Sequence, residues 1–152
     1  FLEQGEPSRA RTARGRSVPV AAVQWLPPIP NPDKTVCVGL NFRAHAEEAK
    51  LSVPARPSLF LRVPGAQVGH RRAIVRPTVS TQFDYEAELA VVIGRRARHV
   101  AAVDAMRCVA GFSCFGDHSI RDWQRHAPQI TPGKNFDGSG AFGPWLATTD
   151  EV

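Results

Sequence analysis

Proline and glycine interrupt the apolar segments of this chain so often that only short helices and strands can form. The 152 residues include 13 Pro and 12 Gly, and the longest uninterrupted apolar run extends from Leu89 to Ile93. A run of this length suits a buried strand and is far too short to cross a bilayer. We therefore expect a β-rich α+β fold with many turns, one hydrophobic core and no membrane span.

Short apolar segments between these breakers mark the expected strands, at residues 35–38, 58–62, 73–75, 85–93 and 108–115. Helices are expected over 42–51, capped by Asn41, and over 119–126, with a helical turn at 103–107. The proline-rich stretch 26–32 must be extended, because each proline fixes its own φ and restricts the residue before it. We therefore divide the chain into a polar, basic segment with its linker, residues 1–27, and a domain, residues 28–152.

The charge and the cysteines of the chain narrow the range of partners and compartments. The N-terminal segment holds arginines at positions 9, 11, 14 and 16. We interpret this patch as a solvated chain end, because no recognisable nucleic-acid-binding motif accompanies it. Three cysteines, Cys37, Cys108 and Cys114, cannot all pair, and each lies among apolar neighbours. This pattern predicts reduced, buried thiols in a cytoplasmic protein.

Three carboxylates alternate along the start of the expected strand 85–93, at Asp84, Glu86 and Glu88. Alternate residues of a strand share a face, so these side chains would repel one another unless a cation lay between them. The same strand continues into a run that needs burial, which favours a hard cation such as Mg²⁺. The alternative is a solvated strand face, or pairing with the plentiful arginines.

A histidine and a glutamate lie three residues apart in the first expected helix, at His45 and Glu48. Residues at this spacing share a helix face. A carboxylate beside an imidazole orients the ring and raises its basicity, which suits a general base acting on water. The alternative is a surface ion pair.

A third group follows the expected strand 108–115. Asp117, Arg121 and Gln124 would lie on one stripe of a helix. A carboxylate, a guanidinium and an amide that converge suit a metal together with an anionic substrate, although exposed helix faces are also commonly charged. Lys134 stands in a glycine-containing loop, where a ligand could approach it or where it could simply be solvated.

Taken together and in this order, these segments resemble the fumarylacetoacetate hydrolase family. The matching segments are 38–45, 84–94, 117–124, 133–137 and 143–148. The resemblance covers about residues 28–152 and implies a mixed β-roll that usually assembles as a homodimer. Domains of this family continue with further strands beyond the point at which this chain stops. We therefore expect the β-roll to be incomplete at its C-terminus.

The resemblance also implies a role for each candidate residue and a class of substrate. The implied roles are Mg²⁺ or Mn²⁺ ligation for Glu86, Glu88 and Asp117, water activation for His45 and Glu48, a pocket position beside the metal for Lys134, and substrate contacts for Arg62, Arg121 and Gln124. The implied substrates are acylpyruvate-like 2-oxo acids or 2-hydroxy-dienoic acids. We expect no nucleic-acid partner and no membrane partner.

The expected reaction is hydrolysis of a C–C bond in a 2-oxo acid. Decarboxylation or isomerisation on the same metal site is the first alternative, and a truncated relative that only binds a ligand is the second. The segment 42–51 contains few apolar residues and would bury little area. We therefore expect it to act as a lid that orders over a bound substrate.

Overall fold

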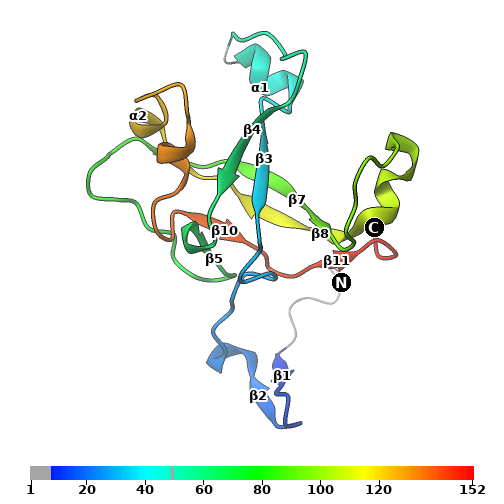
Figure 1. The fold of residues 1–152 in the computed structure, drawn as a ribbon. Helices are drawn as coiled ribbons and strands as arrows, with labels where there is room; N and C mark the ends of the chain where they lie inside the picture. The colour runs from blue at the N-terminus through cyan, green and yellow to red at the C-terminus, as the bar shows by residue number, and fades with distance from the viewer. Residues whose placement is uncertain (1–7, 49) are drawn as a thin grey trace.

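The computed structural model describes residues 8–48 and 50–152, and among these residues more lie in strands than in helices (Figure 1). The helical segments among them are short. They are η1 (Val20–Ala22), α1 (Arg43–Glu48), η2 (Pro64–Ala66), η3 (Ala102–Cys108), α2 (Arg121–Gln124) and η4 (Thr131–Lys134), where η denotes a 3₁₀ helix. Of the predicted helix 42–51, α1 covers residues 43–48. Ala49, which the prediction also includes, lies outside the described residues.

The central sheet is built on β8 (Val109–Gly116). Strand β7 (Ala87–Ile93) pairs with β8 antiparallel along its length. β10 (Gly140–Phe142) and β11 (Ala147–Thr148) also pair with β8 antiparallel, and β5 (Gln67–Val68) extends the sheet parallel to β10. Because β7 and β8 carry the longest apolar segments, their pairing forms the framework on which the site residues are placed.

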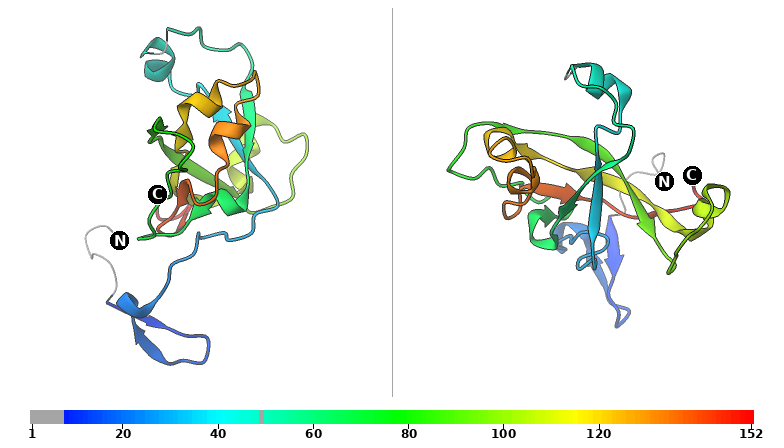
Figure 2. Two further views of the ribbon diagram at one scale, coloured as in Figure 1. Left: turned by 90° about the vertical axis from the view of Figure 1, so that its left-hand side faces the viewer. Right: turned by 45° about the horizontal axis from the view of Figure 1, so that its top comes forward.

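The hydrophobic core lies between this sheet and a separate hairpin of β3 (Thr35–Gly39) and β4 (Ser58–Arg62). Cys37 and Phe60 face each other across the hairpin and are buried with Phe115 and Phe142 of the central sheet. In Figures 1 and 2 the hairpin crosses one face of the central sheet, and α1 lies at its far end, beyond the body of the molecule.

A two-residue ladder joins β6 (Phe83–Asp84) to β9 (Ser119–Ile120) and places the start of α2 beside the site. The turn η4 packs against α2 so closely that a Cβ at Gly133 would lie 2.5 Å from the backbone nitrogen of Gln124. The absence of a side chain at Gly133 therefore brings the next residue, Lys134, into the interior, where its side chain is only 3% exposed.

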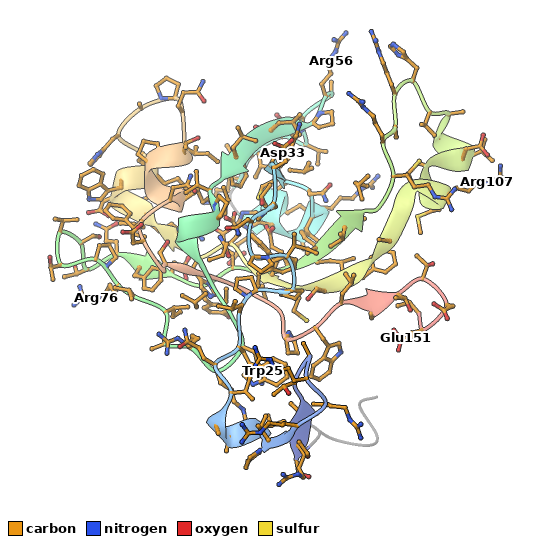
Figure 3. The ribbon with its side chains drawn as sticks, turned by 60° about the horizontal axis from the view of Figure 1, so that its bottom comes forward. Trp25, Asp33, Arg56, Arg76, Arg107 and Glu151 are labelled. Carbon is orange, nitrogen blue, oxygen red and sulfur yellow. The ribbon has the colours of Figure 1, made fainter. Side chains whose placement is uncertain are left out.

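The N-terminal segment differs from the frayed end that its sequence suggested. Strands β1 (Arg9–Arg11) and β2 (Ser17–Pro19) form an antiparallel hairpin, and Gly15 adopts a φ of +76° in its turn. The four arginines of the patch are exposed, as expected. Farther along, the Trp25 ring packs edge-on against His70 with ring centroids 5.7 Å apart, where the segment meets the body (Figure 3).

Three local predictions were wrong in whole or in part. Residues 73–75 form no strand, and the Val75 amide donates to the carbonyl of Gly138 instead of to a neighbouring strand. The predicted strand 85–93 begins two residues later, as β7 at Ala87, because residues 85–86 separate it from β6. The predicted helix 119–126 is reduced to α2, because residues 119–120 pair with β6 instead.

The expected helical turn at 103–107 lies within η3. Burial of the three cysteines is correct for Cys37 alone, since Cys108 is half-buried and Cys114 is exposed, although all three are free thiols. Among the described residues, no helix is long and apolar enough to span a membrane.

Candidate metal centre

Three carboxylates converge at the end of the β7–β8 ladder. Glu86, Glu88 and Asp117 each offer an oxygen, and these oxygens lie within 4.8 Å of one another. The ladder pairs Ala87 with Gly116, so Glu86 and Asp117, which flank this pair, are neighbours, and the Asp117 amide donates to the Glu86 carbonyl at 3.0 Å. Glu88 shares the core-facing side of β7 with Ala90 and Val92, which pack against the core. The centre therefore stands at the rim of the hydrophobic core.

Lys134 brings positive charge into the middle of this cluster. Its Nζ lies 3.1 Å from both carboxylate oxygens of Glu86 and 2.5 Å from Oδ2 of Asp117. The same ammonium lies 5.0 Å from the centre of the Phe60 ring, within cation–π range. Because a buried ammonium is tolerated only beside opposite charge, its position depends on the carboxylates.

Arg62 supplies a second buried cation on the other side of Asp117. Its side chain is 0% exposed, and Nη1 donates to Oδ1 of Asp117 at 2.6 Å and to the carbonyl of His118 at 3.1 Å. Nη2 lies 3.5 Å from the hydroxyl of the fully buried Ser139. Arg62, a candidate substrate-binding residue, therefore lies inside the protein, in contact with the candidate metal ligand Asp117.

Glu86 is the best-satisfied carboxylate of the three. Burial disfavours its charged form, but the charge of Lys134 and a 2.7 Å hydrogen bond from Ser119 outweigh burial and lower the pKa of Glu86. Arg121 adds a contact of 2.6 Å from Nη1 to Oε1 of Glu86. Glu86 is therefore held ionised and fixed in place, which suits a ligand to a cation.

Glu88 is the least satisfied. It forms no hydrogen bond or ion pair with any residue that the structure describes. Burial, followed by the charges of Asp117 and Glu86, raises its pKa to about 7. A divalent cation among the three oxygens would remove this repulsion, and carboxylate oxygens are the ligands that Mg²⁺ and Mn²⁺ prefer. The residues present therefore fit such an ion.

Other predicted residues lie where the sequence did not place them. Asp84, on β6, does not join the cluster but accepts hydrogen bonds at 2.9 and 2.7 Å from Arg121. Arg121 also donates to Oε1 of Gln124 at 2.9 Å. Asp117 precedes β9 and is not part of a helix, so the predicted helical stripe with Arg121 and Gln124 does not exist. Arg121, which lies on α2, nevertheless connects that helix to the three carboxylates through its contact with Glu86.

His45 and Glu48 form the expected pair, with 4.0 Å between Nδ1 and the carboxylate, but the side chains are 50% and 85% exposed. They lie on α1, at the far end of the β3–β4 hairpin (Figure 1). No hydrogen bond or ion pair joins this pair to the three carboxylates among the residues that the structure describes. Their role in activating water stays a prediction.

Two contributors beside Asp117 carried no signal in the sequence. The fully buried hydroxyl of Ser119 donates to Glu86, and Nδ1 of His118 accepts a hydrogen bond from the Glu86 amide at 3.2 Å. Burial, then the charge of Arg62, lowers the pKa of His118, which favours the neutral ring. Their proximity to Asp117 in sequence was the only available clue, because the contacts to Glu86 arise from strand pairing.

Comparison with known proteins identifies the family. A family model described as fumarylacetoacetate (FAA) hydrolase C-terminal matches residues 34–152. The chain belongs to the fumarylacetoacetate hydrolase family. The human protein named oxaloacetate tautomerase FAHD2A, mitochondrial, is 44% identical over 159 residues, covering 100% of this chain and 51% of that protein. The chain spans about half the length of this relative and of the rat protein named oxaloacetate tautomerase Fahd2a, mitochondrial.

Solved structures of family members share the fold. A 5-carboxymethyl-2-hydroxymuconate delta-isomerase from Mycobacterium smegmatis has a TM-score of 0.78 at 35% identity, covering 95% of this chain and 59% of that one. A 2-hydroxyhepta-2,4-diene-1,7-dioate isomerase from Mycobacterium marinum has a TM-score of 0.74 at 37% identity, covering 89% and 49%. The predicted family and its strand-rich fold are confirmed, and the chain comes from a family of enzymes.

Proposed function

We propose that this member of the fumarylacetoacetate hydrolase family is a divalent-metal enzyme that interconverts the keto and enol forms, or double-bond isomers, of a 2-oxo dicarboxylic acid. The convergence of Glu86, Glu88 and Asp117 within 4.8 Å, with Lys134 in contact with two of them, carries the proposal. The relatives named as an oxaloacetate tautomerase and as dienedioate and muconate isomerases support this class of reaction.

Each part of the site has a task in this reaction. A divalent cation held by Glu86, Glu88 and Asp117 would supply Lewis acidity toward a 2-oxo acid. Lys134 places a fixed positive charge at the same position, where negative charge develops when a 2-oxo acid loses a proton from the neighbouring carbon. Arg121, on the outer side of Glu86, is 21% exposed and can reach a substrate carboxylate.

Tautomerisation and isomerisation move a proton between two atoms of one substrate by way of a base, whereas hydrolysis needs a base and a positioned water as well. His45, paired with Glu48 on α1, is the candidate base for either reaction. Proton movement therefore requires fewer groups in the site. Hydrolysis of an acylpyruvate is the second candidate, favoured by the 4.0 Å approach of His45 to Glu48, and decarboxylation would use the same carboxylates.

The test is an assay of the purified protein with oxaloacetate and with an acylpyruvate, each followed by its ultraviolet absorbance. We expect turnover of oxaloacetate between keto and enol forms with Mg²⁺ or Mn²⁺ and none with EDTA. Asp117→Asn should abolish it, while the matched change Asp33→Asn, at a side chain that is 90% exposed, should not. Turnover unaffected by EDTA would refute the proposal, and turnover of the acylpyruvate alone would favour hydrolysis.

Assembly, location and domain boundary stay predictions. A homodimer is supported by apolar side chains on the outer face of the β3–β4 hairpin, where Leu59 and Leu61 are 62% and 53% exposed. Sedimentation analysis of the protein checks this prediction. A cytoplasmic location and the boundary between residues 1–27 and 28–152 rest on the sequence, and the family model begins six residues beyond that boundary, at residue 34.

A further inference from the structure

The two oxygens of Asp117 are bound by two different cations. Nη1 of Arg62 lies 2.6 Å from Oδ1, and Nζ of Lys134 lies 2.5 Å from Oδ2. Lys134 also contacts both oxygens of Glu86, so Oδ2 is the oxygen that faces the other carboxylates. Arg62 forms no hydrogen bond or ion pair with Glu86 or Glu88 among the described residues. Lys134 therefore lies among the carboxylates, whereas the hydrogen bond from Arg62 to the cluster goes to the outer oxygen of Asp117.

We infer that Arg62 is a positioning residue of the metal centre, which holds Asp117 so that Oδ2 faces the cation. The inference rests on the proposed metal site and gives Arg62 a task other than the substrate contact that the resemblance implies. A guanidinium is a rigid planar fork, whereas an ammonium is a point charge. One arm of the fork, Nη1, donates to Asp117 and to the His118 carbonyl, and the other, Nη2, lies against the Ser139 hydroxyl, so the fork itself is held in place. Groups that orient a metal ligand in this way commonly change metal affinity 10- to 100-fold when removed.

The surroundings of Arg62 keep its side chain buried. The side chain is 0% exposed, and a Cβ at Gly140 would lie 2.5 Å from Nη2. Its Nε has no hydrogen-bond partner among the described residues. A buried ion pair with an unsatisfied donor is a poor source of stability. Orientation of Asp117 gives the guanidinium a purpose that the stability of the fold does not.

Arg62 could act on the metal centre through its charge alone or by positioning Asp117, and these two roles predict opposite changes in metal affinity when Arg62 is removed. If Arg62 acted only through its charge, its loss would take a positive group away from the centre, and a divalent cation would bind more tightly. If Arg62 positions Asp117, its loss frees Oδ1 and the cation binds more weakly. Lys134 provides the comparison, because its Nζ lies among the carboxylates and its charge opposes a divalent cation directly.

The experiment measures Mn²⁺ affinity from the electron paramagnetic resonance signal of the free ion. We expect about 10- to 100-fold weaker binding in Arg62→Met and at least about tenfold weaker binding in Arg62→Lys, which keeps the charge but not the fork. Lys134→Met should bind as tightly as the unaltered protein or more tightly. Arg56→Met is the matched control, since Arg56 is exposed and extends from the body (Figure 3).

The outcomes separate this inference from the proposed function. If the unaltered protein does not bind Mn²⁺, the proposed function and the inference both fail. If it binds Mn²⁺ and Arg62→Met binds as tightly or more tightly, only the inference is overturned. Circular dichroism of each variant in EDTA tests folding. Should Arg62→Met unfold, Arg62→Lys decides: unchanged affinity overturns positioning by the fork, and a loss of about tenfold supports it.

Discussion

Replacing Glu88 with glutamine should stabilise the metal-free protein at pH 8 and change its stability little at pH 4.5. The physical reason is that the pKa of Glu88 is raised from 4.5 to about 7, first by burial and then by Asp117 and Glu86. Unfolding restores the ordinary pKa. The folded state is therefore favoured fully below pH 4.5, and it loses this advantage as the pH rises to 7. Glutamine has the shape of the neutral acid and escapes the loss.

The magnitude follows from the shift. A shift of about 2.5 pKa units corresponds to roughly 3.4 kcal/mol at 1.36 kcal/mol per unit. Glu88 is only half-buried, so solvent screening reduces this value to about 1–2 kcal/mol at pH 8. The Coulomb energy of the charges agrees with this value. Two unit charges about 4 Å apart near a protein surface repel by about 4 kcal/mol. The attraction of Glu88 to Lys134 and Arg62 cancels part of this repulsion and brings the net cost to a similar size.

Urea denaturation in EDTA, followed by tryptophan fluorescence, measures the effect as the free energy of unfolding at both pH values. Glu47→Gln, on the exposed surface of α1, is the matched control and should change neither value. The difference between the two variants removes contributions that both share, including the general effect of acid. A Glu88→Gln variant that is less stable than the parent at pH 8, or equally affected at both pH values, would refute the reasoning. A stabilising change that also abolishes Mn²⁺ binding is the expected signature of a ligand kept for function.

Three further predictions concern the carboxylates of the centre, the cysteines and α1. Replacing Glu86 and Glu88 together with alanine should abolish Mn²⁺ binding in calorimetry, and unchanged affinity would remove them from the site. Cys114 should react with a thiol reagent at pH 8 long before Cys37, because Cys114 is exposed and Cys37 is buried. Burial raises the pKa of Cys37 to about 12, so only roughly one Cys37 thiol in ten thousand is ionised at pH 8. Mass spectrometry of the first adduct checks the order. Hydrogen exchange of α1 (Arg43–Glu48) should slow when Mg²⁺ and oxalate are both present, and equal protection with Mg²⁺ alone would dismiss the lid.

The sequence predicted best where local pattern and long-range pairing agree. Strands over 35–38, 58–62 and 108–115 appear as β3, β4 and β8, because their apolar alternation matches a face that the core covers. The shared face of Glu86 and Glu88 also follows from alternation, together with the ladder that brings Asp117 beside them. The three strands and the shared face of the glutamates needed no information about distant partners, whereas the position of Asp117 depends on the ladder.

The sequence predicted poorly where a distant segment decides the structure. The local pattern of residues 119–126 favours a helix, but Ser119 pairs with Asp84 across the β6–β9 ladder, and tertiary pairing overrides propensity. The burial of Arg62 also depends on a distant segment. Its partner Asp117 is 55 residues away, and nothing in the local sequence distinguishes a buried guanidinium from a solvated one. Asp84 left the predicted cluster for a similar reason, since the break at residues 85–86 turns it toward Arg121.

The charges of the centre explain why an anionic ligand suits it. Three carboxylates face two buried cations, Lys134 and Arg62, and the charge of Arg121 is balanced by Asp84. With all the carboxylates ionised, the cluster is left with one excess negative charge, and Glu88 is the group without a partner. A divalent ion would reverse that excess and leave the centre positive. An anionic 2-oxo acid would then restore neutrality in a partly buried site, where uncompensated charge is costly in either sense. The same balance predicts that a neutral analogue lacking the carboxylate binds far more weakly, even with the metal in place.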